Sequence, residues 1–250
     1  MPRYRLTLEY DGGGFHGWQV QAGLPSVQAA LETALLAITG EPTPVTGSGR
    51  TDTGVHALGQ VAHLDTRRDW TPDRLMGALN AHLRPQPVGV LHVARAHSDF
   101  HARFDARRRR YRYRILNRRA PPVLEAGRVW HRPLPLAEDL MQAAAQSLVG
   151  RHDFTSFRAA ECQARSPLRT LDLIHVHRQG EEILIDLAAR SFLHHQVRNI
   201  VGTLVPIGQR LRPIAHMAEV LAARNRAAAG QTAPPQGLYL VDIAYDERSA

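Results

Sequence analysis

One short loop gathers residue types that could do chemistry. Residues 47–56 (GSGRTDTGVH) place three glycines and three hydroxyl side chains around one carboxylate, Asp52. Glycine adopts positive φ at little cost, and serine and threonine hydroxyls can bond nearby backbone. We therefore expect Asp52 to be held in a fixed pose, with Arg50 two residues before it. A polar turn, in which the aspartate bonds only its own backbone, is the structural alternative.

A partner for the carboxylate could come from a predicted helix over residues 194–207. Its apolar stripe consists of Val197, Ile200, Val201 and Leu204. Arg198 lies about 100° around the helix from Val197, at the edge of that stripe. An arginine there could reach inward and keep a carboxylate ionised. The alternative is a surface arginine whose stem covers apolar neighbours.

A tyrosine-rich strand is the third candidate. Alternation over residues 109–116 puts Tyr111, Tyr113 and Ile115 on one face and arginines on the other. Such a face is often plain core. At the edge of a cleft, however, Tyr111 would offer a flat ring to a base and a hydroxyl for a hydrogen bond.

The elements that must position these residues follow one order twice. The first half reads as strand, helix, strand, strand, helix, strand, at residues 4–10, 27–39, 44–46, 60–65, 72–83 and 88–93. In the second half we expect strands at 109–116, 171–177, 183–188 and 238–245, and helices near 140–148, 194–207 and 214–224. Ser26 and Gly40 are typical caps for the first helix.

This order predicts an α+β fold made of two ferredoxin-like halves, residues 1–104 and 105–250. We expect their antiparallel sheets to join, with a basic cleft on the open face. A Rossmann fold fits poorly, because both halves contain paired strands with no helix between them.

The charge favours a polyanionic partner. The net charge is +8, and all 31 basic residues are arginine. An arginine-rich genome would explain the missing lysine but not the positive net charge. Seven arginines lie between Arg103 and Arg114, interleaved with Tyr111 and Tyr113. Phosphate neutralisation combined with a stacking surface is what a nucleic-acid groove requires.

Other function classes find little support. A single cysteine, Cys162, excludes an internal disulfide. We expect no metal site, although His175 and His177 share a strand face, and no Walker or dinucleotide motif is present. No apolar run is long enough for a membrane span, and no signal-peptide pattern begins the chain, so a cytoplasmic location is expected.

The loop also resembles the catalytic motif of TruA-type tRNA pseudouridine synthases, and the resemblance continues in order along the chain. The matching segments are GRTDTGVHA at 49–57, YDG at 10–12, FHGWQ at 15–19, RYRYRI at 110–115, HDFTSFR at 152–158, FLHHQVRNIVG at 192–202, APP at 233–235 and GLYLV at 237–241. One departure is Thr53, where many relatives carry alanine.

The resemblance implies a homodimeric enzyme that isomerises uridine to pseudouridine at positions 38–40 of the tRNA anticodon arm without a cofactor. It makes Asp52 the catalytic nucleophile or base, which could attack C1′ or C6 or take a proton from C2′. Arg198 would be its ion-pair partner and Tyr111 the base-stacking tyrosine. Arg50 would help displace the target base from its stack, and Leu238 would lie against the other side of that base.

Two other interpretations stay open. A non-catalytic RNA-binding protein of the same fold fits the composition equally well. Against it, a carboxylate in a basic groove would repel phosphate without adding affinity. An aspartate-dependent hydrolase or nuclease would need further acids for metal ions, which the sequence around Asp52 does not supply.

Overall fold

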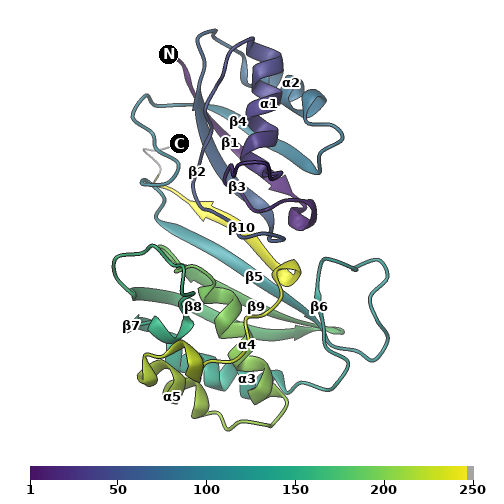
Figure 1. Ribbon diagram of the computed structural model, residues 1–250, viewed down its shortest axis with the longest axis vertical. Helices are drawn as coiled ribbons and strands as arrows, with labels where there is room; N and C mark the ends of the chain where they lie inside the picture. Colours follow the sequence, from purple (N-terminus) through teal and green to yellow (C-terminus); the bar gives the residue numbers. More distant parts are fainter. Residues whose placement is uncertain (247–250) are drawn as a thin grey trace. The chain divides into compact units, whose positions relative to one another are not determined.

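The computed structural model describes residues 1–246 and has a mixed α+β fold. It divides into two compact units (Figure 1). Unit 1 is Met1–Arg109 together with the described residues from Tyr239 onward, and unit 2 is Arg110–Leu238. We expected the last strand of the chain to belong to the second half, residues 105–250. In the structure it lies almost wholly in unit 1. Its pairing partner is a strand that begins directly after the Asp52 loop.

Unit 1 follows the expected element order. It contains β1 (Arg3–Tyr10), α1 (Val27–Thr39), β2 (Thr46–Gly47), β3 (His56–Asp65), α2 (Pro72–His82) and β4 (Val88–Ala96), and β10 (Leu238–Ala244) joins it from the chain end. Strand β1 pairs antiparallel with both β3 and β4, and β2 pairs antiparallel with β3. Strand β10 runs parallel to β3, with Tyr239 opposite His56.

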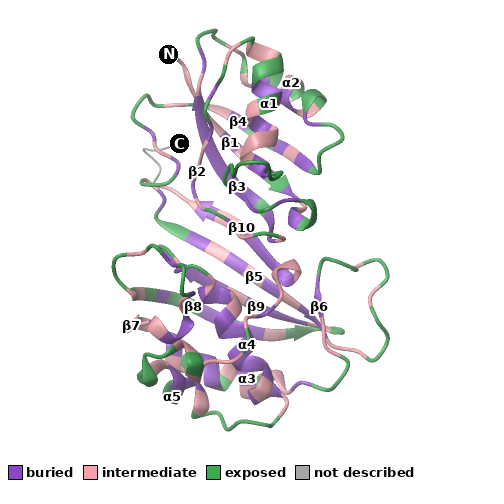
Figure 2. Cartoon of the chain, viewed as in Figure 1, coloured by how far each residue is buried: buried purple, intermediate pink, exposed green. Residues whose placement is uncertain are grey.

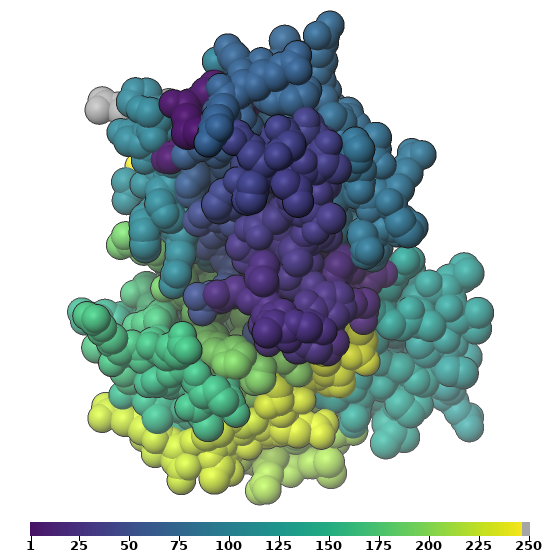
Figure 3. Space-filling model, turned by 45° about the horizontal axis from the view of Figure 1, so that its top comes forward, coloured from purple at the N-terminus to yellow at the C-terminus, as the bar shows by residue number. Residues whose placement is uncertain are grey.

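Helices α1 and α2 supply the core of unit 1. The Ser26 hydroxyl accepts a hydrogen bond from the Ala29 amide at 3.2 Å, and Gly40 ends α1 at φ 76°. Because capping satisfies amides that lack an intrahelical partner, these two residues set the length of α1. The apolar stripes of both helices are buried, as are the alternate residues of β1 and most residues of β3 (Figure 2). Figure 3 shows the outer surface of this layer, with the α1 segment in indigo and α2 in blue.

A buried histidine gives unit 1 a pH-dependent stability. His63 is 7% exposed and accepts a hydrogen bond from the Ala102 amide at 3.2 Å. Burial, together with the nearby Arg3 and His101, lowers the pKa of His63 to about 4, against opposing contributions from Asp65 and Asp105. Histidine 63 is therefore neutral in the folded protein at pH values where an unfolded chain would already protonate it.

We expect this difference to cost stability on acidification. Between about pH 6.5 and pH 4 the unfolded chain binds the extra proton, so the free energy of unfolding falls as the pH falls. Urea titrations at pH 7 and pH 5 should show a loss of about 1 to 2 kcal/mol that His63→Gln lacks. The comparison separates His63 from carboxylates that titrate in the same range. An equal loss in both proteins would contradict the assignment.

Unit 2 contains strands of the sheet and the helices α3, α4 and α5. Its elements are β5 (Arg108–Leu116, whose first two residues belong to unit 1), β6 (Trp130–His131), α3 (Glu138–Ala145), β7 (Gly150–Asp153), β8 (Leu168–Gln179), β9 (Glu182–Ala189), α4 (Gln196–Gly208) and α5 (His216–Ala223). The strand order is β5-β9-β8-β7, and β6 pairs with β5. No helix among residues 1–246 is both long and apolar enough to cross a membrane.

Candidate active site

The Asp52 loop connects β2 to β3 in unit 1. Strand β2 ends at Gly47 and β3 begins at His56, so residues 48–55 form the connection. Asp52 is half-buried within it, and its carbonyl accepts a hydrogen bond from the Val55 amide at 3.1 Å. Gly54 sits at φ 77°, in the left-handed region that favours glycine.

Two buried side chains, Tyr10 and Gln60, hold this loop by hydrogen bonds. The Tyr10 hydroxyl lies 2.8 Å from the Thr51 hydroxyl, immediately before Asp52. The Gln60 side-chain amide donates to the Tyr10 oxygen at 3.4 Å and to the Gly49 carbonyl at 2.8 Å. Gln60 is 0% exposed. Burial raises the pKa of Tyr10 to about 12, so the hydroxyl keeps its proton at neutral pH.

Backbone from residues 12–18 closes on the loop from another direction. The Trp18 amide donates to the Thr51 carbonyl at 3.1 Å. Gly17 has φ +87°, and a Cβ built there would lie 2.5 Å from the same carbonyl oxygen and 3.2 Å from the Asp52 carbonyl carbon. A Cβ at Gly12 would lie 2.0 Å from the Val55 carbonyl oxygen. Only glycine permits approaches this close. The YDG motif at residues 10–12 and the FHGWQ motif at residues 15–19 therefore support the Asp52 loop structurally.

The Tyr10 hydroxyl should matter for both stability and rate. We expect Tyr10→Phe to lower the free energy of unfolding by about 1 to 2 kcal/mol, because the loop loses a buried hydrogen-bond partner. If Asp52 reacts, loosening it should also reduce kcat. Tyr4→Phe is a matched control on the same strand, since the Tyr4 hydroxyl bonds Asp69 and Trp70 instead. It should lower the melting temperature while sparing kcat; equal kcat values for the two variants would count against this role of Tyr10.

Several arginines of the 103–114 segment are structural. Arg109 is buried and donates to the Ser48 carbonyl at 2.7 Å, which anchors the start of the Asp52 loop. On the alternate positions, Arg112 bonds both oxygens of Asp186, and Arg114 bonds both oxygens of Glu182. The segment is therefore partly framework, and its charge cannot all be counted as surface for a nucleic acid.

Tyr111 lies in unit 2 against an aromatic neighbour. It is buried, and its ring meets Phe192 edge to face at a centroid distance of 5.1 Å. Two residues on, the Tyr113 hydroxyl donates to the Pro234 carbonyl at 2.7 Å. Phe192 was inside the quoted 192–202 motif, but nothing in its spacing identified it as the neighbour of Tyr111.

Arg198 and Leu238 are held by the same stretch of chain. Arg198 is half-buried, as its place at the edge of the stripe predicts, and its Nε donates to the Ala233 carbonyl at 2.7 Å. The Ala233 amide in turn donates to the Arg198 carbonyl at 3.1 Å. Leu238 is 5% exposed and follows Gly237, which packs closely on the Tyr113 ring. Residues 233–238 thus connect Arg198 to the Tyr111 strand.

These contacts place the alternating residues of β5 on two sides of the strand. In unit 2, Tyr111 and Tyr113 share the side that carries Arg198 and the 233–238 segment, which is the helix-covered side. The open side holds the ion-paired Arg112 and Arg114 instead. The basic cleft on the open face of the sheet stays a prediction.

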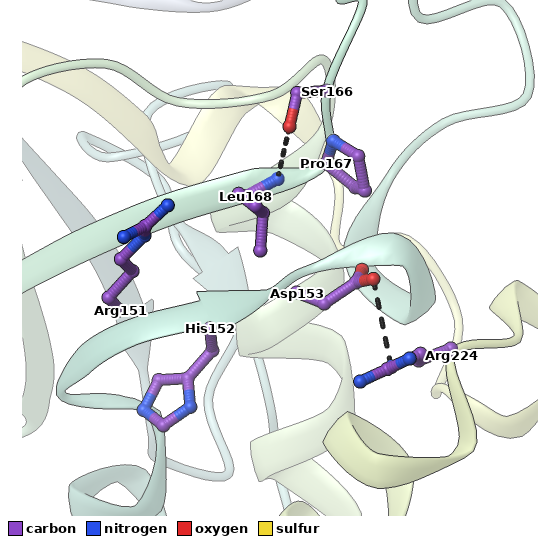
Figure 4. A pocket seen from close by; sticks show the side chains of 7 residues that line it. All are labelled: Arg151, His152, Asp153, Ser166, Pro167, Leu168 and Arg224. Atoms are coloured by element: carbon purple, nitrogen blue, oxygen red, sulfur yellow. Dashed lines mark hydrogen bonds and ion pairs between the residues drawn. The ribbon is translucent and has the colours of Figure 1, made fainter.

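Two other places fall outside the candidate residues. The rings of His175 and His177 stack at 4.7 Å, and among residues 1–246 they join no cluster of three possible metal ligands. A pocket of about 570 Å³ opens at the β7 edge of unit 2 (Figure 4). It is lined by Arg151, His152, Asp153, Ser166, Pro167, Leu168 and Arg224, and it includes none of the five candidate residues.

Comparison with known proteins decides the family. The family model described as tRNA pseudouridine synthase matches residues 7–105 and 144–246. The chain belongs to the tRNA pseudouridine synthase family. Both ranges hold candidate residues: Asp52 and Arg50 in the first, Arg198 and Leu238 in the second. Tyr111 lies between the two matched ranges.

Full-length relatives agree with this assignment to the tRNA pseudouridine synthases. The chain is 59% identical to tRNA pseudouridine synthase A of Bradyrhizobium sp. strain BTAi1 over 98% of this chain and 100% of the relative. It is 56% identical to the protein of the same name from Methylorubrum populi, over 99% and 100%. For that of Rhodospirillum rubrum the identity is 56%, over 100% and 90%.

Proposed function

We propose that this protein isomerises uridine to pseudouridine in tRNA, with the Asp52 carboxylate as the reacting group. The observation that carries the proposal is the bracing of the Asp52 loop, by Tyr10 and Gln60 on one side and by Gly17 and Trp18 on the other, in a chain of this family. A turn that merely connects two strands does not need this many buried partners. A reacting carboxylate does, because its approach to the substrate must be defined.

The proposed reaction balances without an added reagent. The N1–C1′ bond breaks, the uracil rotates, and a C5–C1′ bond forms. The hydrogen on C5 then leaves as a proton, and N1 acquires one. Asp52 could serve by attacking C1′, by attacking C6, or by removing the C2′ proton. All three routes start from an ionised carboxylate with fixed geometry.

The other candidate residues would act around the flipped base. Arg198 would pair with the carboxylate, and its bond to the Ala233 carbonyl supports this by orienting the guanidinium. Tyr111 would stack on the uracil, and its edge-to-face contact with Phe192 supports a fixed ring plane. Leu238 would lie on the other side of the base. Arg50, exposed beside Asp52, would help displace the base from its stem.

We further propose that the substrates are uridines 38–40 of the anticodon arm and that the enzyme is a cytoplasmic homodimer. It would recognise RNA mainly by shape, because base edges in A-form RNA are poorly accessible. Transcripts that carry C5-tritiated uridine at only one of these positions test the substrate. Each should release tritium to water in the presence of a chelator. Release from uridines elsewhere in the tRNA, and not from these, would contradict the assignment.

The RNA-binding and nuclease interpretations give different results in the same experiment. A binding protein would retain the transcripts on a filter and release no tritium. A metal-dependent nuclease would shorten them, and the chelator would stop it. Intact transcripts with released tritium fit only the isomerase.

A further inference from the structure

A column of aromatic rings runs through unit 1 and ends at the surface. Its rings, in order, are Tyr245, Phe100, His63, His101 and Phe104. The successive centroid distances are 5.3, 6.0, 4.9 and 4.2 Å. The first three rings lie in or at the core. The last pair is the closest, with Phe104 tilted by only 33° against His101.

The turn that carries Phe104 is rigidly built. The Asp105 carboxylate accepts from the His101 amide at 2.7 Å, and the Asp105 amide donates to the His101 carbonyl at 3.0 Å. The His101 ring nitrogen Nδ1 lies within 3.3 Å of the amides of Arg103 and Phe104. The Tyr245 hydroxyl fixes the Ala102 carbonyl at 2.6 Å. Phe104 is thus held outward by a hydrogen-bonded frame and not by a loose loop.

Phe104 is exposed where its apolar neighbours in the sequence are not. The residue is 69% exposed, although the apolar residues around it in the sequence, Phe100, Ala102 and Ala106, are all buried. A rigid turn that presents a large apolar ring to water forgoes the stabilisation that burial would give. Such a ring is commonly part of a contact surface.

The surroundings of Phe104 are basic. The Arg103 guanidinium carbon lies 5.9 Å from the centroid of its ring, and Arg107 and Arg108 follow within four residues, both exposed. Arg109, Arg112 and Arg114 are occupied within the fold, and Arg107 pairs with Asp246 at 2.7 Å. Arg103 and Arg108 are therefore the arginines near Phe104 that this segment offers to an anion. An exposed flat ring among arginines fits a nucleotide, which supplies a base to stack and a phosphate to neutralise.

We propose that Phe104 is a stacking platform for an unpaired base of the substrate RNA, with Arg103 and Arg108 contacting the adjacent phosphates. A base on the outer face of Phe104 would extend the ring column by one member. The base must be unpaired, because bases within a stem are already stacked on both sides. This inference rests on RNA being the substrate, as proposed above, and adds a contact outside the five candidate residues.

Substitutions at Phe104 separate stacking from simple apolar contact. Equilibrium filter binding of an unmodified tRNA transcript should give a Kd roughly 5- to 100-fold higher for Phe104→Ala. Phe104→Leu should lose most of that affinity too, because it keeps apolar volume but no ring. Phe104→Trp should retain it, and its added fluorescence should be quenched by the transcript. Leu124→Trp, at an 88% exposed position in unit 2, is the matched control and should show neither effect.

Defined outcomes would overturn the platform. An unchanged Kd for Phe104→Ala would do so, as would full affinity in Phe104→Leu. A change in sedimentation mass for Phe104→Ala, with RNA affinity intact, would show a protein contact instead. The binding assay is independent of turnover. If Phe104→Ala lost RNA binding and the unmodified protein released no tritium, the platform would be supported and the isomerase proposal contradicted. If Phe104→Ala kept its RNA affinity and the unmodified protein released tritium, the isomerase would be supported and the platform contradicted.

Discussion

Asp52→Asn is expected to slow pseudouridine formation by at least about 1,000-fold while the protein still binds tRNA. Asparagine keeps the shape of aspartate but is neither a nucleophile nor a base at neutral pH. Loop contacts to Thr51 and Gly54 involve their own hydroxyl and amide groups, so the loop should keep its conformation. The rate is measured as tritium release under single-turnover conditions, with enzyme in excess, so that weaker binding cannot imitate a loss of chemistry.

Asp172→Asn provides the control for this change. Asp172 is exposed on β8 in unit 2, and its replacement removes one negative charge in the same way. It should leave the single-turnover rate within about twofold, as is usual for an exposed surface position. If Asp52→Asn retained more than a few per cent of the rate, the carboxylate would not be the reacting group, and the bracing of its loop would need another explanation.

Gly17→Ala is expected to disturb the site through the backbone. The position has φ +87°, and the new Cβ would lie 2.5 Å from the Thr51 carbonyl oxygen. Strain from the left-handed conformation and overpacking against rigid backbone should together lower the free energy of unfolding by about 2 to 5 kcal/mol. Because the clash falls on the peptide joining Thr51 to Asp52, the reaction rate should drop by about 100-fold even where the protein is fully folded.

Gly23→Ala separates the two contributions. Gly23 has a similar φ of +75°, but a Cβ there would have nothing within 4 Å. This variant should show the conformational cost alone, about 1 kcal/mol, with an unchanged rate. Urea unfolding and single-turnover rates of both variants are the measurements. Equal rates for Gly17→Ala and Gly23→Ala would mean that the close approach to Thr51 does not position Asp52.

Local signals in the sequence predicted the helices well. Ser26 and Gly40 bound α1 where capping chemistry places them, and the apolar stripe of α4 is buried throughout. α4 begins at Gln196 rather than His194, since His195 takes a left-handed φ of 61° before it. Strand β7 was not anticipated: its four residues, Gly150–Asp153, are too short and too polar to show alternation.

The residues that contact the Asp52 loop from distant segments could not be predicted from the sequence. It located Asp52 on a constrained loop, but not the constraints, because Tyr10, Gly17 and Gln60 act from other segments. Gln60, an amide side chain in a mostly buried strand, was the available signal for one of them. The placement of β10 beside β3 depends on a parallel pairing across most of the chain, which no local pattern encodes. The arginine cluster in the sequence likewise predicted a positive charge. It could not predict which of the guanidinium groups form ion pairs within the fold.

Tritium release from intact tRNA tests the central claim most directly. The unmodified protein is incubated with a tRNA transcript labelled at every uracil C5, with chelator present, and the water is counted while the transcript length is checked. The account predicts release that approaches whole equivalents of label per tRNA, from transcripts that stay full length. Tight tRNA binding with no tritium released, across a complete pool of tRNA species, would contradict it.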